Sequence, residues 1–410
     1  MPGKKYIAEL GEWQGFNVGT TGRFDSGATD ETSKICIELI PDPSRPVFCS
    51  GCGEVVETVH EWTGRWVRDL PAWGTETWLL VNLRRMKCQR CGTAMEEVPW
   101  LSPYARLTKR FAQSVARLCR EVPIRHVAGH FGFSWDRVKR IHKAYLKEEL
   151  GEPDLSGVTE IGFDEFAIQK GHRYATIIIE PRTRRVLWVG RGRGREDVRP
   201  FFEKLGKQGC ERLQAVVMDM WEPYEQQVRM HCPNAKIVYD LFHIKSKYGR
   251  EVVDRVRIEQ VNRLKHDKAA RKVVKGTRWI LLRNENNLCP DDRVRLRELL
   301  AANQRLAKVH VLKEDLAQLW KYKDEGAARR FWEGWYERAI RSRIEPLKRF
   351  AKLLKKRLPG ILAPCKHPLN TSIIEGLNNK IKVIKRMAYG FRDDEYFFLR
   401  IREAFPGNRG

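Results

Sequence analysis

Two aspartates occupy positions at which a carboxylate is costly to bury. Asp219 directly follows the apolar run Ala215–Met218, and Asp164 lies in the stretch 158–168, whose composition is typical of a β-strand. Burying an isolated carboxylate is unfavourable, and a bound divalent cation offsets that cost. Because ligand groups of an open α/β sheet gather at the carboxyl ends of its inner strands, these residues predict a magnesium site. Glu165 neighbours Asp164, but adjacent strand residues point to opposite faces, so only one of the two can join the site.

A third carboxylate is expected on a helix later in the chain. The stretch 369–392 has helical periodicity, and Glu375 lies in its first turn. Its apolar face consists of Ile374, Leu377, Ile381 and Ile384. Ser372 and Glu375 also match the S-x-x-E capping box, in which both side chains bond to free backbone N–H groups. Spacing alone therefore leaves a catalytic and a capping role for Glu375 equally open.

Four of the ten cysteines form two C-x-x-C pairs. Cys49 and Cys52 make up one pair, Cys88 and Cys91 the other, and a glycine that permits a tight turn follows each pair. Four thiolates with this spacing are typical of a closed tetrahedral zinc site that stabilises a small domain. The alternatives are a redox motif or two unrelated thiol pairs, but the sequence has no thioredoxin-like strand–helix context around them. We therefore expect structural Zn²⁺.

The segment after these cysteines predicts a helix-turn-helix. Apolar residues recur with helical spacing over 107–121, a short helix over 124–131 ends at Gly132, and Ser134 is the expected N-cap of a third helix. The third helix carries Val138, Ile141 and Tyr145 inward and Trp135, Asp136, Lys139, Arg140 and Lys143 outward. This arrangement is typical of motifs whose last helix enters the DNA major groove. We expect Ser134, Trp135, Lys139, Arg140 and Lys143 to contact DNA; the alternative is a packing hairpin with a solvated basic face.

From residue 158 onward the pattern becomes α/β. Three consecutive strands are followed by alternating helix and strand, which is the order of the RNase H-like fold. The expected strands are 158–168, 173–180, 184–192, 213–220 and 235–244, and the expected helices are 195–206 and 224–233. After residue 243, about 120 residues have helical periodicity and many Lys and Arg, so we expect an α-helical insertion whose basic faces hold DNA.

The charge of the chain favours a polyanionic partner. The 77 Lys and Arg exceed the 52 Asp and Glu by 25 among 410 residues. Nucleic acid is the leading partner, and a merely basic surface is the alternative. The apolar runs are far shorter than the roughly 20 residues of a membrane-spanning helix, and the N-terminus has no apolar core of a secretory signal. We expect a cytoplasmic, nucleoid-associated protein with no membrane partner.

Several stretches, taken together, are specific to one protein family. Besides the two cysteine pairs they are VAGHFGFSWDRVKRIHKAYL, IGFDEFA, VVMDMWEPY, YDLFHI, TRWILLRN and IIEGLNNKIKVIKRMAYGFR. Along nearly its whole length the chain resembles the ISL3 family of bacterial insertion-sequence transposases. The resemblance implies an RNase H-like core with an Asp-Asp-Glu triad at Asp164, Asp219 and Glu375, and it favours a catalytic role for Glu375.

The resemblance also implies the chemistry and the partners. It implies two-metal phosphoryl transfer with Mg²⁺ or Mn²⁺ on double-stranded DNA, both terminal inverted repeats and target, by a homodimer or larger assembly. It singles out Asp240 and His243, which would brace the site or contact DNA, although a structural role is equally open. Trp279 would stack on DNA, but a tryptophan among apolar residues is usually core, and we expect core. The competing functions are an inactive repressor or relict transposase and a nuclease without strand transfer.

The expected domain order follows from these segments. It comprises an N-terminal segment of unassigned role (1–45), the zinc-binding module (46–100), the helix-turn-helix (101–150), the catalytic core (156–243 and 368–403) and the helical insertion (244–367).

Overall fold

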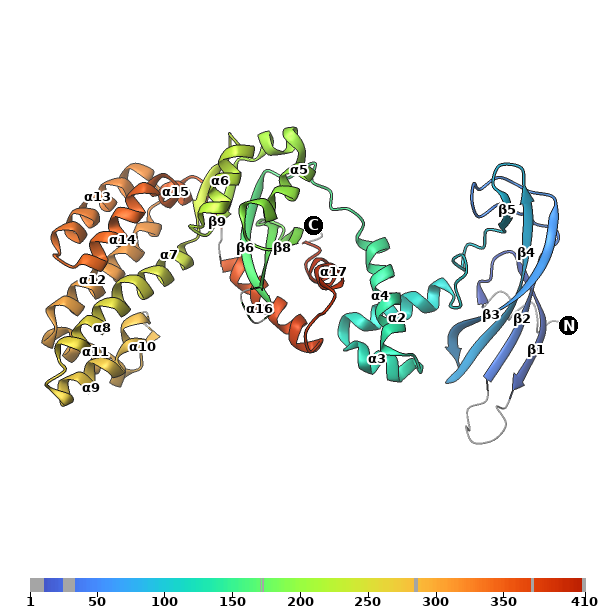
Figure 1. The fold of residues 1–410 in the computed structure, drawn as a ribbon, viewed down its shortest axis with the longest axis horizontal. Coiled ribbons are helices and arrows are strands. Elements are labelled where there is room, and N and C mark those ends of the chain that lie inside the picture. Colours follow the sequence, from blue (N-terminus) through green and yellow to red (C-terminus); the bar gives the residue numbers. More distant parts are fainter. Residues whose placement is uncertain are drawn as a thin grey trace. The chain divides into compact units, whose positions relative to one another are not determined.

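The chain forms two compact units, residues 1–151 and 152–410 (Figure 1). The computed structural model describes residues 11–24, 34–169, 171, 173–283, 287–369 and 372–407; the side chains of Phe24 and of residues 372–375 lie outside that description. No helix in these ranges is long and apolar enough to cross a membrane.

The first unit begins with a five-stranded sheet (Figure 1). Its strands are β1 (Phe16–Phe24), β2 (Lys34–Pro41), β3 (Val59–Ala72), β4 (Thr75–Cys88) and β5 (Gly92–Met95), in the order β1-β2-β4-β3 with β5 also paired to β4. Trp73 and Gly74 connect β3 to β4 with φ of 50° and 74°, positive values typical of tight hairpin turns. Strands β1 and β2 lie in the segment without an assigned role, and β2 pairs with β4. The expected boundary at residue 45 therefore falls within one sheet.

Three helices follow and confirm the predicted helix-turn-helix elements: α2 (Lys109–Glu121), α3 (Ile124–Phe131) and α4 (Trp135–Leu150). The expected signals are present, because Ser134 Oγ accepts a bond from the Arg137 backbone N at 3.3 Å and Gly132 ends α3 with φ of 64°. The inward face of α4 was predicted only in part. Its fully buried residues are Val138, His142 and Leu146, whereas Ile141 and Tyr145 are half-buried.

The second unit contains a mixed sheet in the order β10-β9-β6-β7-β8. Its strands are β6 (Glu160–Gln169), β7 (Arg173–Glu180), β8 (Arg185–Arg191), β9 (Ala215–Met218) and β10 (Lys236–Tyr239). Strands β6, β7 and β8 are antiparallel neighbours, and β9 and β10 run parallel to β6. These are the predicted strands, but the last is shorter than expected. It ends at Tyr239 because Asp240 caps the following helix.

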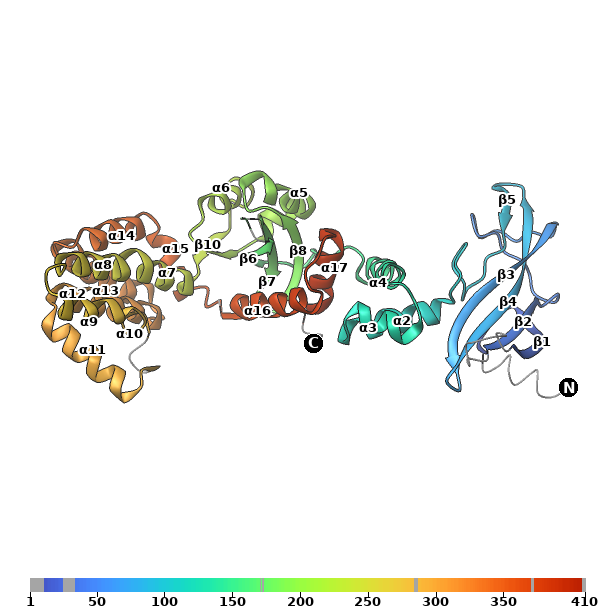
Figure 2. The same ribbon diagram turned by 60° about the horizontal axis from the view of Figure 1, so that its bottom comes forward.

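Helices cover both faces of this sheet (Figure 2). Helices α5 (Arg195–Arg212) and α6 (Glu222–His231) pack on the face that carries Phe163, Val216 and Met218. Helices α16 (Ser372–Met387) and α17 (Asp394–Ala404) pack on the opposite face, against Phe166 and Val217. Because side chains alternate along a strand, the two faces bury different residues of the same strands.

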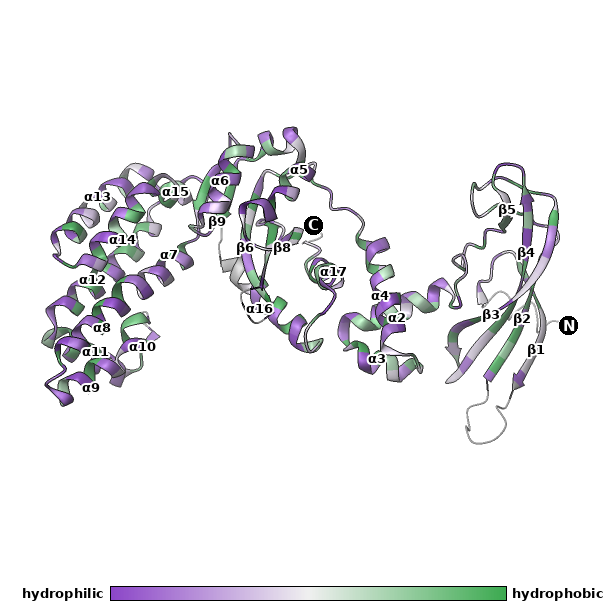
Figure 3. Ribbon diagram, viewed as in Figure 1, coloured by the Kyte–Doolittle hydropathy of each residue, from purple (hydrophilic) through white to green (hydrophobic). Residues whose placement is uncertain are grey.

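Most of the described residues between β10 and α16 are helical. The helices are α7 (Leu241–Tyr248), the π-helical turn Gly249–Val253, α8 (Asp254–Arg263), α9 (Lys268–Gly276), α10 (Arg278–Leu282), α11 (Pro290–Ala302), α12 (Gln304–Gln318), α13 (Glu325–Arg341), α14 (Glu345–Lys356) and α15 (Leu358–Leu362). Hydrophobic and hydrophilic residues alternate along these ribbons (Figure 3), as in amphipathic helices around a shared core. Two buried polar side chains join them: Tyr248 Oη donates to Val309 O at 2.9 Å, and Trp335 Nε1 to Leu312 O at 2.8 Å.

Candidate active site and cysteine cluster

Three aspartates line up at one end of the parallel strands. Gly162 is paired with Val217 and Met218 with Tyr239, and continuing these registers sets Asp164 beside Asp219 and Asp219 beside Asp240. In-register residues of parallel strands project to the same face. Side chains two residues apart on a strand lie on the same face. The three aspartates therefore share the face of Phe166, Val217 and Val238, which α16 and α17 cover.

Asp164 is the more buried of the two predicted magnesium ligands whose side chains the structure describes, since Asp219 is half-buried. Only 7% of it is exposed, its Oδ1 accepts a bond from the Glu165 backbone N at 2.7 Å, and its Oδ2 accepts one from Asn378 Nδ2 at 2.5 Å. Burial raises the pKa of Asp164 to about 7, despite the bond from the backbone of Glu165. A cation bound beside this carboxylate would favour its ionised form, which burial disfavours.

The neighbouring Glu165 belongs to the other face of the sheet. Its Oε1 accepts a bond from Arg193 Nη1 at 2.8 Å, and the Arg193 guanidinium lies over the rings of Tyr174 and Trp221. Of the two adjacent carboxylates, it is Asp164 that meets α16.

The sequence placed Asp240 and His243 at the end of a strand. In the structure they form a pair at the start of α7. Asp240 Oδ1 accepts a bond from the Phe242 backbone N at 2.8 Å, and its Oδ2 lies 2.9 Å from His243 Nδ1. The bond from Asp240 raises the pKa of His243 to about 9, and the charges of Asp219 and Asp164 act in the same direction. His243 is thus a cation at neutral pH, adjacent to the three aspartates.

The side chain of Glu375 lies outside the described residues, as does the predicted capping box with Ser372. The backbone at 375 belongs to α16, one turn before Asn378, whose amide contacts Asp164. Asn378 is a site residue that the sequence interpretation missed, although its spacing from Glu375 in the helix was the available signal. Its amide oxygen is buried without a hydrogen-bond partner in the described part of the chain. An unpaired acceptor beside carboxylates fits a hard cation, which prefers oxygen ligands.

The four paired cysteines come together as predicted. All four Sγ atoms lie within 4.8 Å of one another. The Gly51 backbone N donates to Cys49 Sγ at 3.4 Å, and the Cys91 backbone N donates to Cys88 Sγ at 3.4 Å. Bonds from the backbone N of Gly51 and Cys52 lower the pKa of Cys49 to about 7, which favours the thiolate that binds metal. The cluster fits a structural zinc ion with four thiolate ligands.

The predicted DNA-contacting residues lie at the start and on one side of α4. Trp135 and Arg140 are exposed, and the Lys139 ammonium lies 5.6 Å from the Trp135 ring centroid. Lys143 is half-buried, and Ser134 is exposed but caps the helix. This side of α4 is therefore accessible at Trp135 and Arg140 and partly accessible at Lys139 and Lys143.

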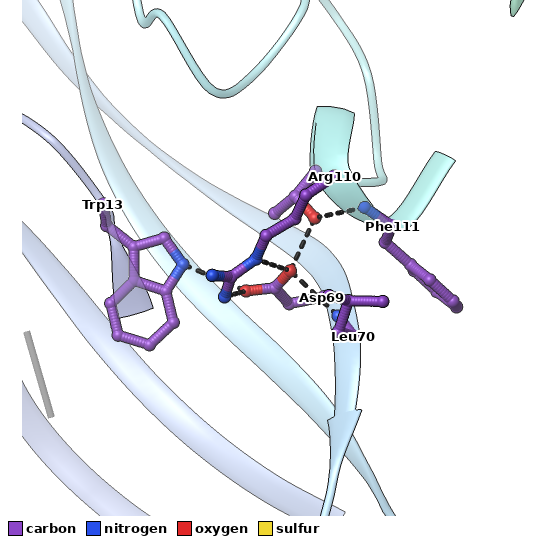
Figure 4. Close-up of polar contacts among 6 residues, drawn as sticks. Trp13, Asp69, Leu70, Arg110 and Phe111 are labelled. Atoms are coloured by element: carbon purple, nitrogen blue, oxygen red, sulfur yellow. Dashed lines mark hydrogen bonds and ion pairs between the residues drawn. The ribbon is translucent and has the colours of Figure 1, made fainter. Parts of the chain in front are cut away.

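In the first unit, a buried carboxylate joins the sheet to helix α2 (Figure 4). Asp69 of β3 is 0% exposed and accepts bonds from Trp13 Nε1 at 3.0 Å, Thr108 Oγ1 at 2.6 Å and Arg110 Nε at 2.9 Å. Burial by itself would raise the pKa of Asp69, but the bonds from Arg110 and Thr108 hold it below its usual value of 3.8. One side chain thus links the N-terminal segment, the sheet and α2.

Replacing Asp69 with Asn is expected to destabilise the protein by about 1–3 kcal/mol at pH 7, because the half-buried Arg110 loses its counter-charge and the donors of Trp13 and Thr108 lose a charged acceptor. Because the pKa of Asp69 in the folded protein is below 3.8, its ionised carboxylate stabilises the fold above pH 3.8. This stabilisation is lost as the pH falls further. Urea unfolding at several pH values checks both points. The difference between wild type and variant should shrink below pH 3.8, and exposed Glu57→Gln should show neither effect. A difference independent of pH would contradict this assignment.

Three family models match the chain. Residues 45–91 match the zinc-finger of transposase IS204/IS1001/IS1096/IS1165, residues 96–146 the helix-turn-helix domain of transposase family ISL3, and residues 161–401 an ISL3 family described as transposase. The chain is 47% identical over 409 residues, 100% of both chains, to the transposase for insertion sequence element IS1001 of Bordetella parapertussis. It is 25% identical over 412 residues to the transposase for IS1557 of Mycobacterium tuberculosis, covering 94% of this chain and 92% of that one.

Proposed function

The chain belongs to the ISL3 family of insertion-sequence transposases, and we propose from this that it cuts and joins DNA at the ends of its element with divalent metal. The observation that carries the proposal is the convergence of Asp164, Asp219 and Asp240 on the sheet face covered by α16. Helix α16 contains Glu375, the third carboxylate of the proposed Asp-Asp-Glu triad.

We assign the catalytic core to the RNase H-like fold. Three antiparallel strands, two further strands parallel to the first and the order β10-β9-β6-β7-β8 support this assignment. The helical residues 244–367 are proposed to be an insertion in the core, because β10 precedes them and α16, which follows them, packs on the same sheet.

Asp164, Asp219 and Glu375 would hold two Mg²⁺ or Mn²⁺ ions. When bound, these ions activate water for attack on a phosphodiester and stabilise the charge of the leaving oxygen. The protein contributes a water-poor position for Asp164 and orients its carboxylate through Glu165 and Asn378. Cationic His243, oriented by Asp240, would pair with a phosphate oxygen beside the carboxylates. The 3′-hydroxyl freed by that cut would then attack a phosphodiester of target DNA in the same site, so that a new ester bond forms as the 3′-oxygen of the target strand leaves.

The first unit would recognise the terminal inverted repeats. The accessible side of α4, with Trp135, Lys139, Arg140 and Lys143, suits the major groove, and the zinc module and the bonds of Asp69 support its helices. Because Lys and Arg contacts to phosphate release counterions, binding would weaken steeply with salt. Two ends must be joined, so a homodimer or larger assembly is part of the proposal.

The helical residues 244–367 would hold DNA near the active site. Helices α8 and α9 and their connection carry seven exposed cations: Arg255, Arg263, Lys265, Lys268, Arg271, Lys272 and Lys275. Trp279 is 65% exposed and lies under the Arg278 guanidinium, which is 5.3 Å from its ring centroid, so the prediction that Trp279 belongs to the core was wrong. Short helix α10 buries Ile280 and Leu281 instead. An exposed tryptophan within a basic surface suits stacking on a base, which we propose as its role.

Incubating the protein with labelled DNA from the ends flanking its own gene tests the function. Cuts at the repeat boundary that require Mg²⁺, followed by joining to a second duplex, are the expected result. Tight specific binding without any cut would favour the repressor, and cutting without joining or repeat specificity would favour the nuclease.

A further inference from the structure

The Asn378 side chain and the strand backbone each bond to a different carboxylate oxygen of Asp164. Asn378 Nδ2 donates to Asp164 Oδ2 at 2.5 Å, while Asp164 Oδ1 accepts a bond from the Glu165 backbone N at 2.7 Å. Leu377 and Ile381 on the same helix are buried against the sheet, which fixes the position of α16 relative to β6. One carboxylate oxygen of Asp164 is therefore positioned by the backbone of β6 and the other by α16.

The amide oxygen of Asn378 lacks a partner of its own. It is inaccessible to solvent and accepts no hydrogen bond from the residues that the structure describes. Buried side-chain acceptors without a partner are rare in native proteins, and each calls for an explanation such as an ion. Hard divalent cations take carboxylate and amide carbonyl oxygens as ligands.

We propose that Asn378 is a further ligand residue of the cation site, with its amide nitrogen holding Asp164 and its amide oxygen binding the cation. The inference rests on the metal-dependent function proposed above. An asparagine suits the position because its side chain has a donor for the carboxylate and an acceptor for the ion. Aspartate would offer only acceptors, and an apolar residue would offer neither.

Cation titrations of the full-length protein without DNA test this role. Melting temperature is measured against Mg²⁺ and Mn²⁺ concentration for wild type, Asn378→Ala, Asn378→Asp and the control Asn379→Ala, whose residue is exposed on the same helix. Removing the ligand is expected to raise the half-saturating concentration about 10- to 100-fold. Asn378→Asp places a second carboxylate beside Asp164, so it should melt lower without cation and saturate at a lower concentration.

Opposite shifts in the two variants would establish the ligand role, because loss of packing alone lowers stability without changing the cation requirement. A half-saturating concentration unchanged within twofold in both variants would overturn the inference while leaving the function standing. If Asn378→Ala fails to fold, the shift in Asn378→Asp decides. A wild-type protein without any response to either cation in melting or cleavage would overturn the proposed function and this inference together.

Discussion

Replacing Asp219 with Asn is expected to lower DNA cleavage at least about a thousandfold, equivalent to about 4 kcal/mol of transition-state stabilisation. Asp219 lies between Asp164 and Asp240 in the strand registers, so its loss removes the central carboxylate of the proposed cation site. Binding to the terminal repeats should be unchanged, because α4 belongs to the other compact unit. Gel-shift and cleavage assays on the same labelled DNA measure both quantities.

The control for this variant is Asp291→Asn, which removes an exposed aspartate of α11 and should leave cleavage unchanged. Misfolding is distinguishable from loss of a ligand. Without cation, a folded Asp219→Asn variant should have the circular dichroism spectrum of wild type, because Asn has nearly the same shape as Asp. Retained cleavage in a folded variant would refute the assignment of Asp219 as a metal ligand.

Replacing Cys88 with Ser is expected to abolish zinc binding and unfold the sheet of the first unit. Cys88 is buried at the end of β4, where its Sγ accepts a bond from the Cys91 backbone N. Structural zinc contributes about 10–16 kcal/mol of apparent binding energy at neutral pH, and that energy is coupled to folding. Zinc content by elemental analysis and circular dichroism check the two expectations.

Cys36→Ser is the matched control, because Cys36 lies in the same sheet but outside the cysteine cluster. It should keep its zinc and bind the repeats as wild type does. Specific DNA binding should be lost in Cys88→Ser, since the sheet supports α2 through Asp69. Unchanged zinc content in Cys88→Ser would remove the basis of the zinc assignment.

Features governed by residues near one another in the chain were predictable. Ser134 and Gly132 delimit α4 and α3 because capping and left-handed backbone conformations depend on a few adjacent residues. The cysteine pairs predicted the cluster for the same reason, since each pair needs only one tight turn. The strands and helices of the second unit followed from the apolar pattern, with the last strand drawn too long because Asp240 is both a strand-end residue and a helix cap.

Features that join distant residues were settled only by the tertiary structure. The registers of β6, β9 and β10 bring Asp164, Asp219 and Asp240 to neighbouring positions at one end of the sheet. The pairing of β2 with β4 decides that the N-terminal segment belongs to the other sheet. The sequence by itself determined which elements form and which residue types carry the chemistry. Only packing decided that Asn378 reaches Asp164 and that Trp279 is exposed, because such contacts depend on the placement of whole helices rather than on local periodicity.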